Sequence, residues 1–219
     1  YTATGGKLVE VGKNNGCTPK QLERAIGAST AAIAYFIQPD WGDSAMSLED
    51  TVEIAHAHNI PVIADAAYQI YPLDYFRSNA LSADLVCFGA KYLGAPHSTG
   101  FVCGRRDLVN AVTANGFIGF HTGGAKAIGR PMKVDRQDIV GVIAALRDWF
   151  ATDHETRLMN VERKLSTIQE GLQGIPYVDT ELLQVQRFWG FSLHVNIDIN
   201  QNKQRTASIV RDLAEGTPR

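Results

Sequence analysis

The sequence has few cysteines, no large excess of charge of either sign and no long unbroken apolar run. Its three cysteines are widely spaced and form no CxxC pair, which excludes a disulfide-stapled miniprotein and predicts free thiols in a reduced, cytoplasmic setting. The 21 basic and 23 acidic residues leave a formal net charge of −2, so bulk positive charge cannot hold a nucleic acid. The longest uncharged stretch, 108–125, is broken by glycines and is too polar to span a bilayer.

What remains is the composition of an ordinary globular protein, with 219 residues, 45% of them apolar and 20% charged. This length fits one large domain, or one domain with a smaller appendage. Both ends are nevertheless abrupt. The chain starts at Tyr1 rather than Met, enters an apolar segment at 7–11, and stops at Arg219 in a turn sequence. We therefore expect the chain to be a fragment of a longer protein.

Strand and helix signals alternate through the first two thirds of the chain. Short apolar strands are predicted at 7–11, 31–37, 60–64, 85–88 and 101–103, and helices at 18–26, from 47 onward and at 106–114. The strands at 60–64 and 85–88 are apolar throughout, which is typical of parallel strands buried on both faces. The alternation predicts an α/β fold with a mostly parallel, doubly wound sheet.

The pattern changes after residue 131. Apolar residues at three-four spacing between 139 and 172 predict one long helix, or two helices broken near 152–153. Residues 191–199 alternate apolar and polar, which predicts an antiparallel strand with one wet face. We divide the chain into a large domain that lacks its amino-terminal part, a linking helix, and the start of a small, truncated α+β domain. Their ranges are 1–134, 135–174 and 175–219.

Two charged residues follow neighbouring strands of the predicted sheet. Asp65 ends the strand at 60–64, and Lys91 lies just past the strand at 85–88. In open parallel sheets, ligands lie beyond the carboxyl ends of the strands. The residues between the two are enough for one helical crossover, so both side chains can face one pocket.

A carboxylate and an amine in this arrangement suit pyridoxal 5'-phosphate, which needs a lysine for its Schiff base and an acidic partner for its pyridine nitrogen. Asp65 would keep that nitrogen protonated, so that the ring accepts electrons from a carbanion at the substrate Cα. Lys91, once displaced by the substrate amine, would move a proton at the same carbon. Spacing alone leaves an alternative open, in which Asp65 caps a turn and Lys91 is a surface lysine.

The segments around these residues carry a family resemblance. VIADAA at 62–67, DLVCFGAK at 84–91, GAPHSTGFVCGRRDL at 94–108 and IGRPMKVD at 128–135 together resemble fold-type I pyridoxal phosphate enzymes. They are most similar to the selenocysteine synthase-like group, the aminotransferase class V-like relatives of L-seryl-tRNA(Sec) selenium transferase, which also includes sugar-amino-acid ammonia lyases. The resemblance covers nearly the whole chain, including a strand of this group at 7–12.

By position, the resemblance implies that Lys91 forms the aldimine with the cofactor and that Asp65 is the partner of the pyridine nitrogen. Ala67 would lie against the ring, where a small side chain leaves room. The group often has a serine shortly before the lysine, near the cofactor phosphate, and residues 88–90 offer no hydroxyl. The resemblance further implies that the phosphate cradle, and the residue that stacks on the outer face of the ring, come from sequence before Tyr1.

The resemblance also implies a basic pair, Arg130 and Lys133, that meets anionic groups of the substrate at the mouth of the site. A solvated pair before a helix is the alternative. A loop of four residues would reach the cofactor phosphate of a partner subunit, because these enzymes build their sites across a dimer interface. The loop consists of His97, Ser98, Thr99 and Gly100, and we assign His97 to substrate binding and the other three to the cofactor.

Weaker signals predict neither a nucleotide loop nor a metal site. In the glycine-rich segment 119–126, Ala125 separates the glycines from Lys126, and Ala127 follows where a phosphate loop has a hydroxyl residue. We expect a flexible loop near the site entrance instead. His56 and His58 are two apart on a helix and do not share a face. Besides His97, only His121 is placed for a catalytic role. Trp41 could line the pocket or pack beneath its loop.

The sequence thus predicts a pyridoxal phosphate enzyme that acts on a small or phosphorylated amino acid, by α,β-elimination that releases a 2-oxo acid and ammonia. Selenium transferase-type β-replacement on a tRNA remains an alternative. So do a transaminase or racemase that uses the same two residues, and a catalytically inert α/β binding scaffold. We prefer the lyase because the charge of −2 offers no obvious basic surface for tRNA. A homo-oligomer with its site at the subunit interface is implied, and no membrane partner is expected.

Overall fold

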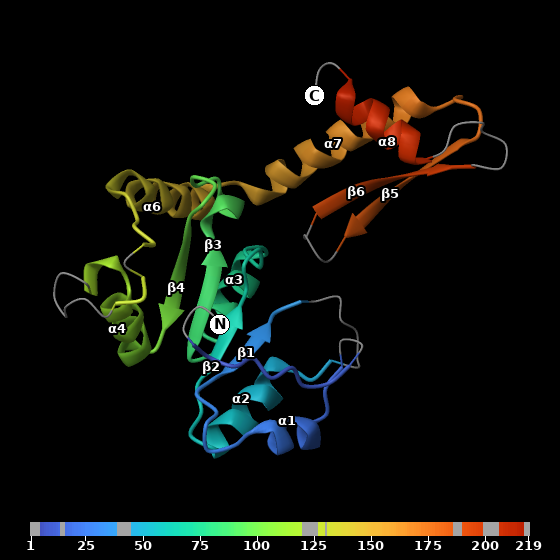
Figure 1. Cartoon of the computed structure of the whole chain (residues 1–219). Coiled ribbons are helices and arrows are strands. Elements are labelled where there is room, and N and C mark those ends of the chain that lie inside the picture. Colours follow the sequence, from blue (N-terminus) through green and yellow to red (C-terminus); the bar gives the residue numbers. More distant parts are fainter. Residues whose placement is uncertain are drawn as a thin grey trace. The chain divides into compact units, whose positions relative to one another are not determined.

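The structure is a computed structural model that describes residues 5–13, 16–38, 45–119, 127–129, 131–185, 190–198 and 206–216. The chain divides into two compact units, Tyr1–Thr152 (unit one) and Asp153–Arg219 (unit two), and Figure 1 shows the elements of each. The predicted division at 134 and 174 into large domain, linking helix and small domain stays a prediction.

Unit one is built on a four-stranded sheet with the order β1-β2-β3-β4. Strands β1 (Ile33–Phe36), β2 (Val62–Asp65) and β3 (Leu85–Gly89) are parallel, and β4 (Gly100–Gly104) runs antiparallel to β3. The mixed, parallel-rich sheet confirms the predicted α/β class. The last strand can reverse because the connection at 90–99, which contains a short 3₁₀ helix, is not the long crossover that a parallel strand needs.

Two helices of unit one begin at the cap residues that the sequence indicates. Helix α1 (Pro19–Ala25) has a capping box in which Thr18 and Gln21 satisfy each other's backbone N–H groups. Helix α2 (Leu48–Ala57) is capped by Ser47, which accepts from the N–H of Asp50 at 3.0 Å. Helix α3 (Leu73–Asn79) is the crossover between β2 and β3, and α4 (Arg106–Asn115) follows β4.

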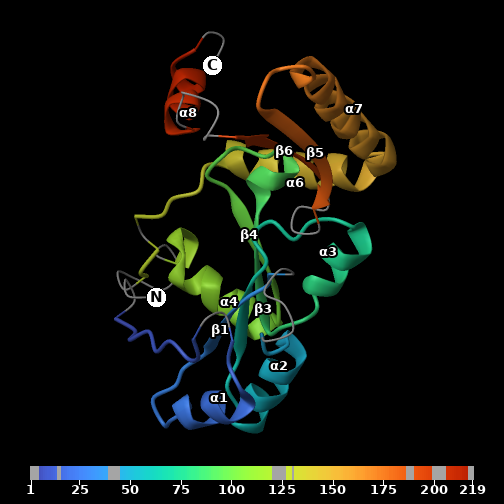
Figure 2. The ribbon, with the colours of Figure 1, turned by 90° about the vertical axis from the view of Figure 1, so that its right-hand side faces the viewer.

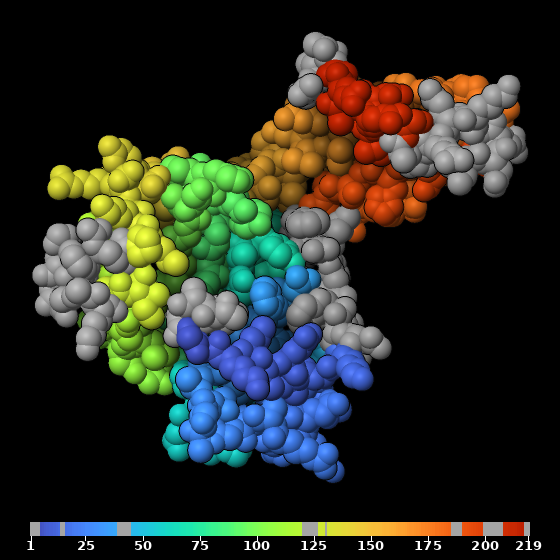
Figure 3. All heavy atoms as spheres, in the orientation of Figure 1, coloured from blue at the N-terminus to red at the C-terminus, as the bar shows by residue number. Residues whose placement is uncertain are grey.

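The predicted strand at 7–11 is wrong. These residues form no regular structure, and the side chains of Leu8 and Val9 are 61% and 59% exposed. The segment lies on the surface of unit one in Figure 3. A strand needs a neighbour for its backbone hydrogen bonds, and among the described residues the nearest pairing is a single bridge between Lys13 and Gly16. An apolar pattern alone does not supply a partner.

The core of unit one lies between the sheet and the helices that follow it. Its main cluster consists of Ala64, Ala66, Ile70, Phe76, Val86, Phe88, Leu93 and Ala145. Phe88 of β3 packs edge-on against Phe76 of α3, with ring centroids 4.9 Å apart, and stacks on Phe101 of β4 at 5.2 Å. Trp149 of α6 (Arg136–Ala151) donates from Nε1 to the carbonyl of Ile70 at 2.9 Å. These contacts fix the turns at the ends of β2 and β3.

Helix α6 ends at 151, and α7 (His154–Leu172) begins after the extended residues Thr152 and Asp153. Of the two alternatives, the broken pair of helices is the one observed. Asp153 caps α7 by accepting from the backbone N–H of Glu155 and Thr156.

In unit two, α7 packs on a hairpin of β5 (Val178–Val185) and β6 (Gly190–Ile197), as Figure 2 shows. The antiparallel pairing confirms the prediction for β6. Helix α8 (Thr206–Glu215) follows. None of the described helices is both long enough and apolar enough to cross a membrane.

Candidate active site

Asp65 is the last residue of β2 and lies between Phe36 of β1 and Cys87 of β3 in the register of the sheet. Its Oδ1 accepts a hydrogen bond from the backbone N–H of Ala67 at 2.9 Å, which closes the turn after the strand. No described residue donates to the other carboxylate oxygen. The half-buried side chain therefore keeps one acceptor available at the carboxyl edge of the sheet, which is the edge where β1, β2 and β3 end.

The turn after β2 is joined to both neighbouring strands by backbone hydrogen bonds. The carbonyl of Asp65 accepts from the N–H of Ile37 at 2.9 Å on the β1 side. On the β3 side, Ala66 donates to the carbonyl of Cys87 at 3.0 Å, and Gly89 donates to the carbonyl of Ala67 at 2.9 Å. The position of Asp65 is thus set by the sheet and does not depend on a long loop.

Lys91 lies in a short 3₁₀ helix, Ala90–Leu93, that begins directly after β3. The side chain is exposed, and its Nζ lies 5.0 Å from the centre of the Tyr92 ring, within the range of a cation–π contact. Tyr92 in turn meets the ring of Tyr68 edge-on at 6.1 Å. Within the described part of the chain Lys91 makes no ion pair, so its amine is available for a ligand.

The segment 96–100 returns to the same edge. Ala90 donates its N–H to the carbonyl of Thr99 at 3.0 Å, and Thr99 Oγ1 donates to the carbonyl of Pro96 at 2.6 Å. Gly100 pairs with Gly89 in the register of β3 and β4, and a Cβ at Gly100 would lie 2.7 Å from the carbonyl oxygen of Phe88. The connection is therefore closely packed at the base of β4.

The structure brings together five of the predicted residues at the carboxyl edge: Asp65, Ala67, Lys91, Thr99 and Gly100. His97 and Ser98 lie exposed in the same connection. Lys133 is exposed, with its Nζ 5.3 Å from the ring centre of Phe117, and no contact among the described residues joins it to Asp65 or Lys91. Arg130, His121, Trp41 and nearly all of 119–126 lie outside the described residues.

Three residues at this edge were not predicted. The ring of Tyr92 lies against the amine of Lys91 and meets the ring of Tyr68 edge-on, and Gln69 is wholly buried four residues after Asp65. The one sequence signal for Gln69 is a polar residue between aromatic and aliphatic neighbours, in the turn after the strand.

The opposite edge of the sheet carries a second charged group, Asp84, whose side chain is 3% exposed. One carboxylate oxygen accepts from the backbone N–H of Val62 at 2.8 Å and from His56 Nε2 at 2.9 Å, and the other accepts from Arg105 at 2.9 Å. Burial acts to raise the pKa of Asp84, but these hydrogen bonds outweigh it and hold the pKa below its ordinary value. This cluster is structural, because its carboxylate is fully used by the protein.

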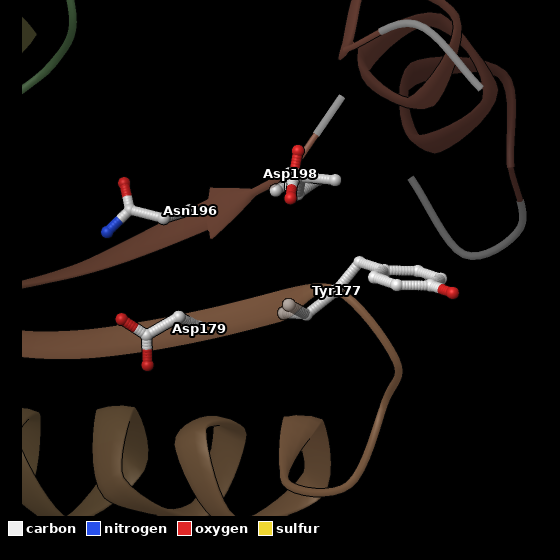
Figure 4. Close-up of a pocket in the computed structure, with 6 residues that line it drawn as sticks. Tyr177, Asp179, Asn196 and Asp198 are labelled. Atoms are coloured by element: carbon white, nitrogen blue, oxygen red, sulfur yellow. The ribbon is translucent and has the colours of Figure 1, made fainter. Parts of the chain in front are cut away.

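Unit two contains a depression of about 410 Å³, shown in Figure 4. It is lined by Tyr177, Val178, Asp179, Asn196, Ile197 and Asp198. The lining offers carboxylates and an amide but no lysine, histidine or thiol that could act as base or nucleophile. No group of three or more metal-ligating side chains gathers anywhere among the described residues. Among the described residues, Asp65 and Lys91 at the carboxyl edge remain the candidate site.

A family model for L-seryl-tRNA selenium transferase matches residues 1–203. The chain belongs to the L-seryl-tRNA selenium transferase family. The match confirms the resemblance inferred from the segments around Asp65 and Lys91.

Curated relatives within and around this family differ in activity. The chain is 34% identical over 197 residues to D-glucosaminate-6-phosphate ammonia lyase of Salmonella typhimurium, covering 88% of the chain and 49% of the relative. It is 34% identical over 183 residues to 5'-C-glycyluridine monooxygenase-decarboxylase of a Streptomyces species (82% and 43%). It is 27% identical over 186 residues to L-seryl-tRNA(Sec) selenium transferase of Moorella thermoacetica (78% and 37%).

A solved structure of D-glucosaminate-6-phosphate ammonia-lyase superposes with a TM-score of 0.74 at 27% identity, over 97% of this chain and 54% of that one. The match confirms the predicted fold. The chain spans about half the length of the solved relative and less than half of the three curated ones.

Proposed function

We propose that the protein containing this chain is a pyridoxal 5'-phosphate-dependent enzyme that eliminates a β substituent from a small or phosphorylated amino acid, releasing a 2-oxo acid and ammonia. The observation that carries the proposal is the hydrogen bond from Gly89 to Ala67, which places the turns of Asp65 and Lys91 side by side at the carboxyl edge. The 34% identity to an enzyme named as an ammonia lyase supports elimination over other outcomes.

The groups at this edge fit the cofactor. Among the described residues, no group donates to one of the Asp65 carboxylate oxygens, which leaves it as an acceptor for a protonated ring nitrogen. The amine of Lys91 is exposed, and Ala67 presents only a methyl group beside Asp65. When bound, pyridoxal phosphate supplies an electron sink for negative charge at the substrate Cα.

Each residue at the carboxyl edge would then have its own role in catalysis or binding. Lys91 takes the Cα proton, and the face of the Tyr92 ring stabilises the resulting ammonium. Asp65 holds the positive charge on the ring nitrogen. Ser98, Thr99 and Gly100 would contribute to a phosphate site, and His97 to substrate binding.

Lys133 and Arg130 would attract the anionic groups of a phosphorylated substrate by charge. Their cationic side chains suit a phosphate or carboxylate better than a neutral substrate. This assignment predicts weaker binding of phosphorylated substrates, with unchanged cofactor binding, when either side chain is removed.

A second candidate is β-replacement on a seryl-tRNA, which the family model over residues 1–203 favours. It would use the same Lys91 and Asp65, and it differs in that a selenium nucleophile adds where the lyase releases product. Binding of tRNA that weakens steeply with salt would support it. Equal binding of tRNA and unrelated RNA would count against it.

We also propose a homo-oligomer in the cytoplasm whose active site lies at a subunit interface. Burial raises the pKa of Cys87 and Cys103, so their thiols are kept protonated and unreactive. All three cysteines are free, as a reducing compartment requires. Sedimentation of the cofactor-loaded protein would measure the assembly.

The test uses the full-length protein incubated with the cofactor. We expect a visible absorbance band and, after borohydride reduction and proteolysis, cofactor attached to the Lys91 peptide. A panel of amino acids and amino sugar acids, with and without phosphate, is then scored for 2-oxo acid and ammonia. Lys91→Ala should abolish attachment and reduce turnover by at least about 100-fold.

Lys20→Ala is the matched control, because Lys20 is an exposed lysine of α1 on the surface. It should leave both measurements unchanged. Cofactor attachment to any lysine other than Lys91, or none in folded protein, would end the proposal.

A further inference from the structure

Gln69 is the largest fully buried side chain in the described part of the chain, with 0% of its surface exposed. It lies in the turn between β2 and α3, four residues after Asp65. Its Nε2 donates to the carbonyl of Ile37 at 3.0 Å, whereas its Oε1 has no hydrogen-bond partner among the described residues. A buried amide with an unused acceptor is costly for folding. A methionine of similar length would fill the space without that cost, so packing alone does not account for this residue.

The partner of Gln69 connects it to Asp65. Ile37, just past the end of β1, donates its N–H to the carbonyl of Asp65 at 2.9 Å and accepts from Gln69 through its own carbonyl. Both polar groups of one residue are thus used to hold the turn that carries Asp65. The N–H of Gln69 also donates to the carbonyl of Ala66 at 2.8 Å, which keeps the turn compact.

The two sides of this turn are anchored differently. On the β3 side, Ala66 donates a backbone hydrogen bond to the strand and Ala67 accepts one from it. On the β1 side, one backbone hydrogen bond is reinforced by the side chain of Gln69. Gln69 is therefore a side-chain link between the end of β1 and the turn that carries Asp65.

We infer that Gln69 is a positioning residue for Asp65, which holds the carboxylate at the place where the ring nitrogen of the cofactor binds. The inference rests on the proposed function. It assigns Gln69 no contact with the reacting atoms and no effect on Lys91. A positioning role predicts that replacing Gln69 weakens cofactor binding only when the Asp65 carboxylate is present.

A double-mutant cycle tests this in the full-length protein, with the dissociation constant of pyridoxal 5'-phosphate as the measurement. Gln69→Met keeps the length of the side chain and removes both polar groups. It should raise the dissociation constant about tenfold in the wild-type background. In the Asp65→Asn background it should change the constant by less than about twofold. The same factor in both backgrounds, or no effect in either, would overturn the inference.

Asn79→Leu is the control, because Asn79 is a second buried amide with an unpartnered nitrogen among the described residues. It ends α3, whose chain leads to the start of β3 and so to the edge opposite Asp65. The variant should lower the melting temperature or leave it unchanged, with no change in cofactor affinity. An equal loss of affinity in Asn79→Leu and Gln69→Met would show a general effect of destabilisation and refute the positioning role.

A second variant keeps the test decisive if Gln69→Met does not fold. In Gln69→Glu, a protonated carboxyl can still donate to Ile37, and an ionised one cannot. At low pH the variant should bind pyridoxal 5'-phosphate with the same dissociation constant as the wild type. As pH rises, the ratio of the variant's constant to that of the wild type should increase. A ratio independent of pH would contradict the inference.

The proposed function has separate outcomes. If Lys91→Ala and Asp65→Asn both leave cofactor binding unchanged, the proposed function fails whatever Gln69 does. If both weaken binding and the Gln69 effect is additive with that of Asp65, only the positioning role fails.

Discussion

Gly89 donates its backbone N–H to the carbonyl of Ala67 at 2.9 Å, and this hydrogen bond joins the turn that carries Asp65 to the strand end that carries Lys91. The close approach favours a residue without a side chain. A Cβ at Gly89 would lie 3.0 Å from the Tyr92 ring and 3.2 Å from the carbonyl oxygen of Ala67. The spacing of the two charged groups therefore depends on a close backbone contact.

Gly89→Ala should push the Tyr92 ring or the Ala67 carbonyl outward and separate the two turns. We expect the free energy of unfolding to fall by about 1–3 kcal/mol, with a larger proportional loss of cofactor affinity. Chemical denaturation and cofactor titration would measure both. Gly171→Ala in α7, where a Cβ meets no atom within 4 Å, should instead stabilise by about 0.5–1 kcal/mol. Equal affinity in Gly89→Ala and wild type would contradict the role of the contact.

The buried carboxylate of Asp84 predicts an acid-sensitive fold. Its pKa is lowered in the folded state, so its stabilisation is complete at neutral pH and is lost as pH falls from about 4 through the folded pKa. Asp84→Asn should lower the free energy of unfolding at pH 7 by about 1–3 kcal/mol and flatten the fall of melting temperature in acid. Thermal melts between pH 7 and pH 3 would show both effects. Asp74→Asn, which removes an exposed ion pair with Arg77, should follow the wild-type curve, and a flattened curve in that variant would refute the assignment to Asp84.

The cap of α1 predicts a local effect on stability. Thr18→Ala removes the side-chain acceptor for Gln21 N–H and should cost about 1 kcal/mol. Asp135 occupies the same position before α6 but makes no side-chain cap hydrogen bond. When both variants are unfolded with urea, Asp135→Ala should therefore lower the free energy of unfolding by less than Thr18→Ala does. The reverse order would show that the capping hydrogen bond is not the stabilising feature.

Trp149 predicts a coupling between α6 and the turn after β2. Trp149→Phe keeps an aromatic ring in the core but leaves the carbonyl of Ile70 without its indole donor at 2.9 Å. We expect a loss of about 1 kcal/mol in the free energy of unfolding. Amide hydrogen exchange should also be faster at Gln69 and Ile70. Unchanged exchange at these two residues would show that the hydrogen bond does not restrain the turn.

The sequence was sufficient to place Asp65 and Lys91 because both follow apolar strands, and strand ends in a parallel sheet meet at one edge. Helix starts were equally accessible, since Thr18 and Ser47 are themselves the caps. The family resemblance then narrowed the chemistry to one cofactor, a step that the spacing of two residues does not permit.

Other features depend on contacts that no local pattern records. The segment at 7–11 has the composition of a strand, but pairing requires a second segment at the right distance. The side-chain amide of Gln69 donates to the carbonyl of Ile37, 32 residues away in the sequence. A single glutamine forms no periodic pattern from which this contact could be predicted. The contact between Lys91 and Tyr92 depends on the short 3₁₀ turn after β3, which the glycines around it did not predict.

The hydrogen bond from Val62 N–H to Asp84 fixes the register between strands β2 and β3. It joins the first residue of β2 to the residue that precedes β3, next to the pair Ile63 and Leu85. A slip of one residue would advance β2 by about 3.3 Å and turn Asp65 to the other face of the sheet. It would also leave a buried carboxylate without its backbone donor. The hydrogen bond between Val62 and Asp84, at the edge where these strands begin, therefore keeps Asp65 and Lys91 aligned at the carboxyl edge.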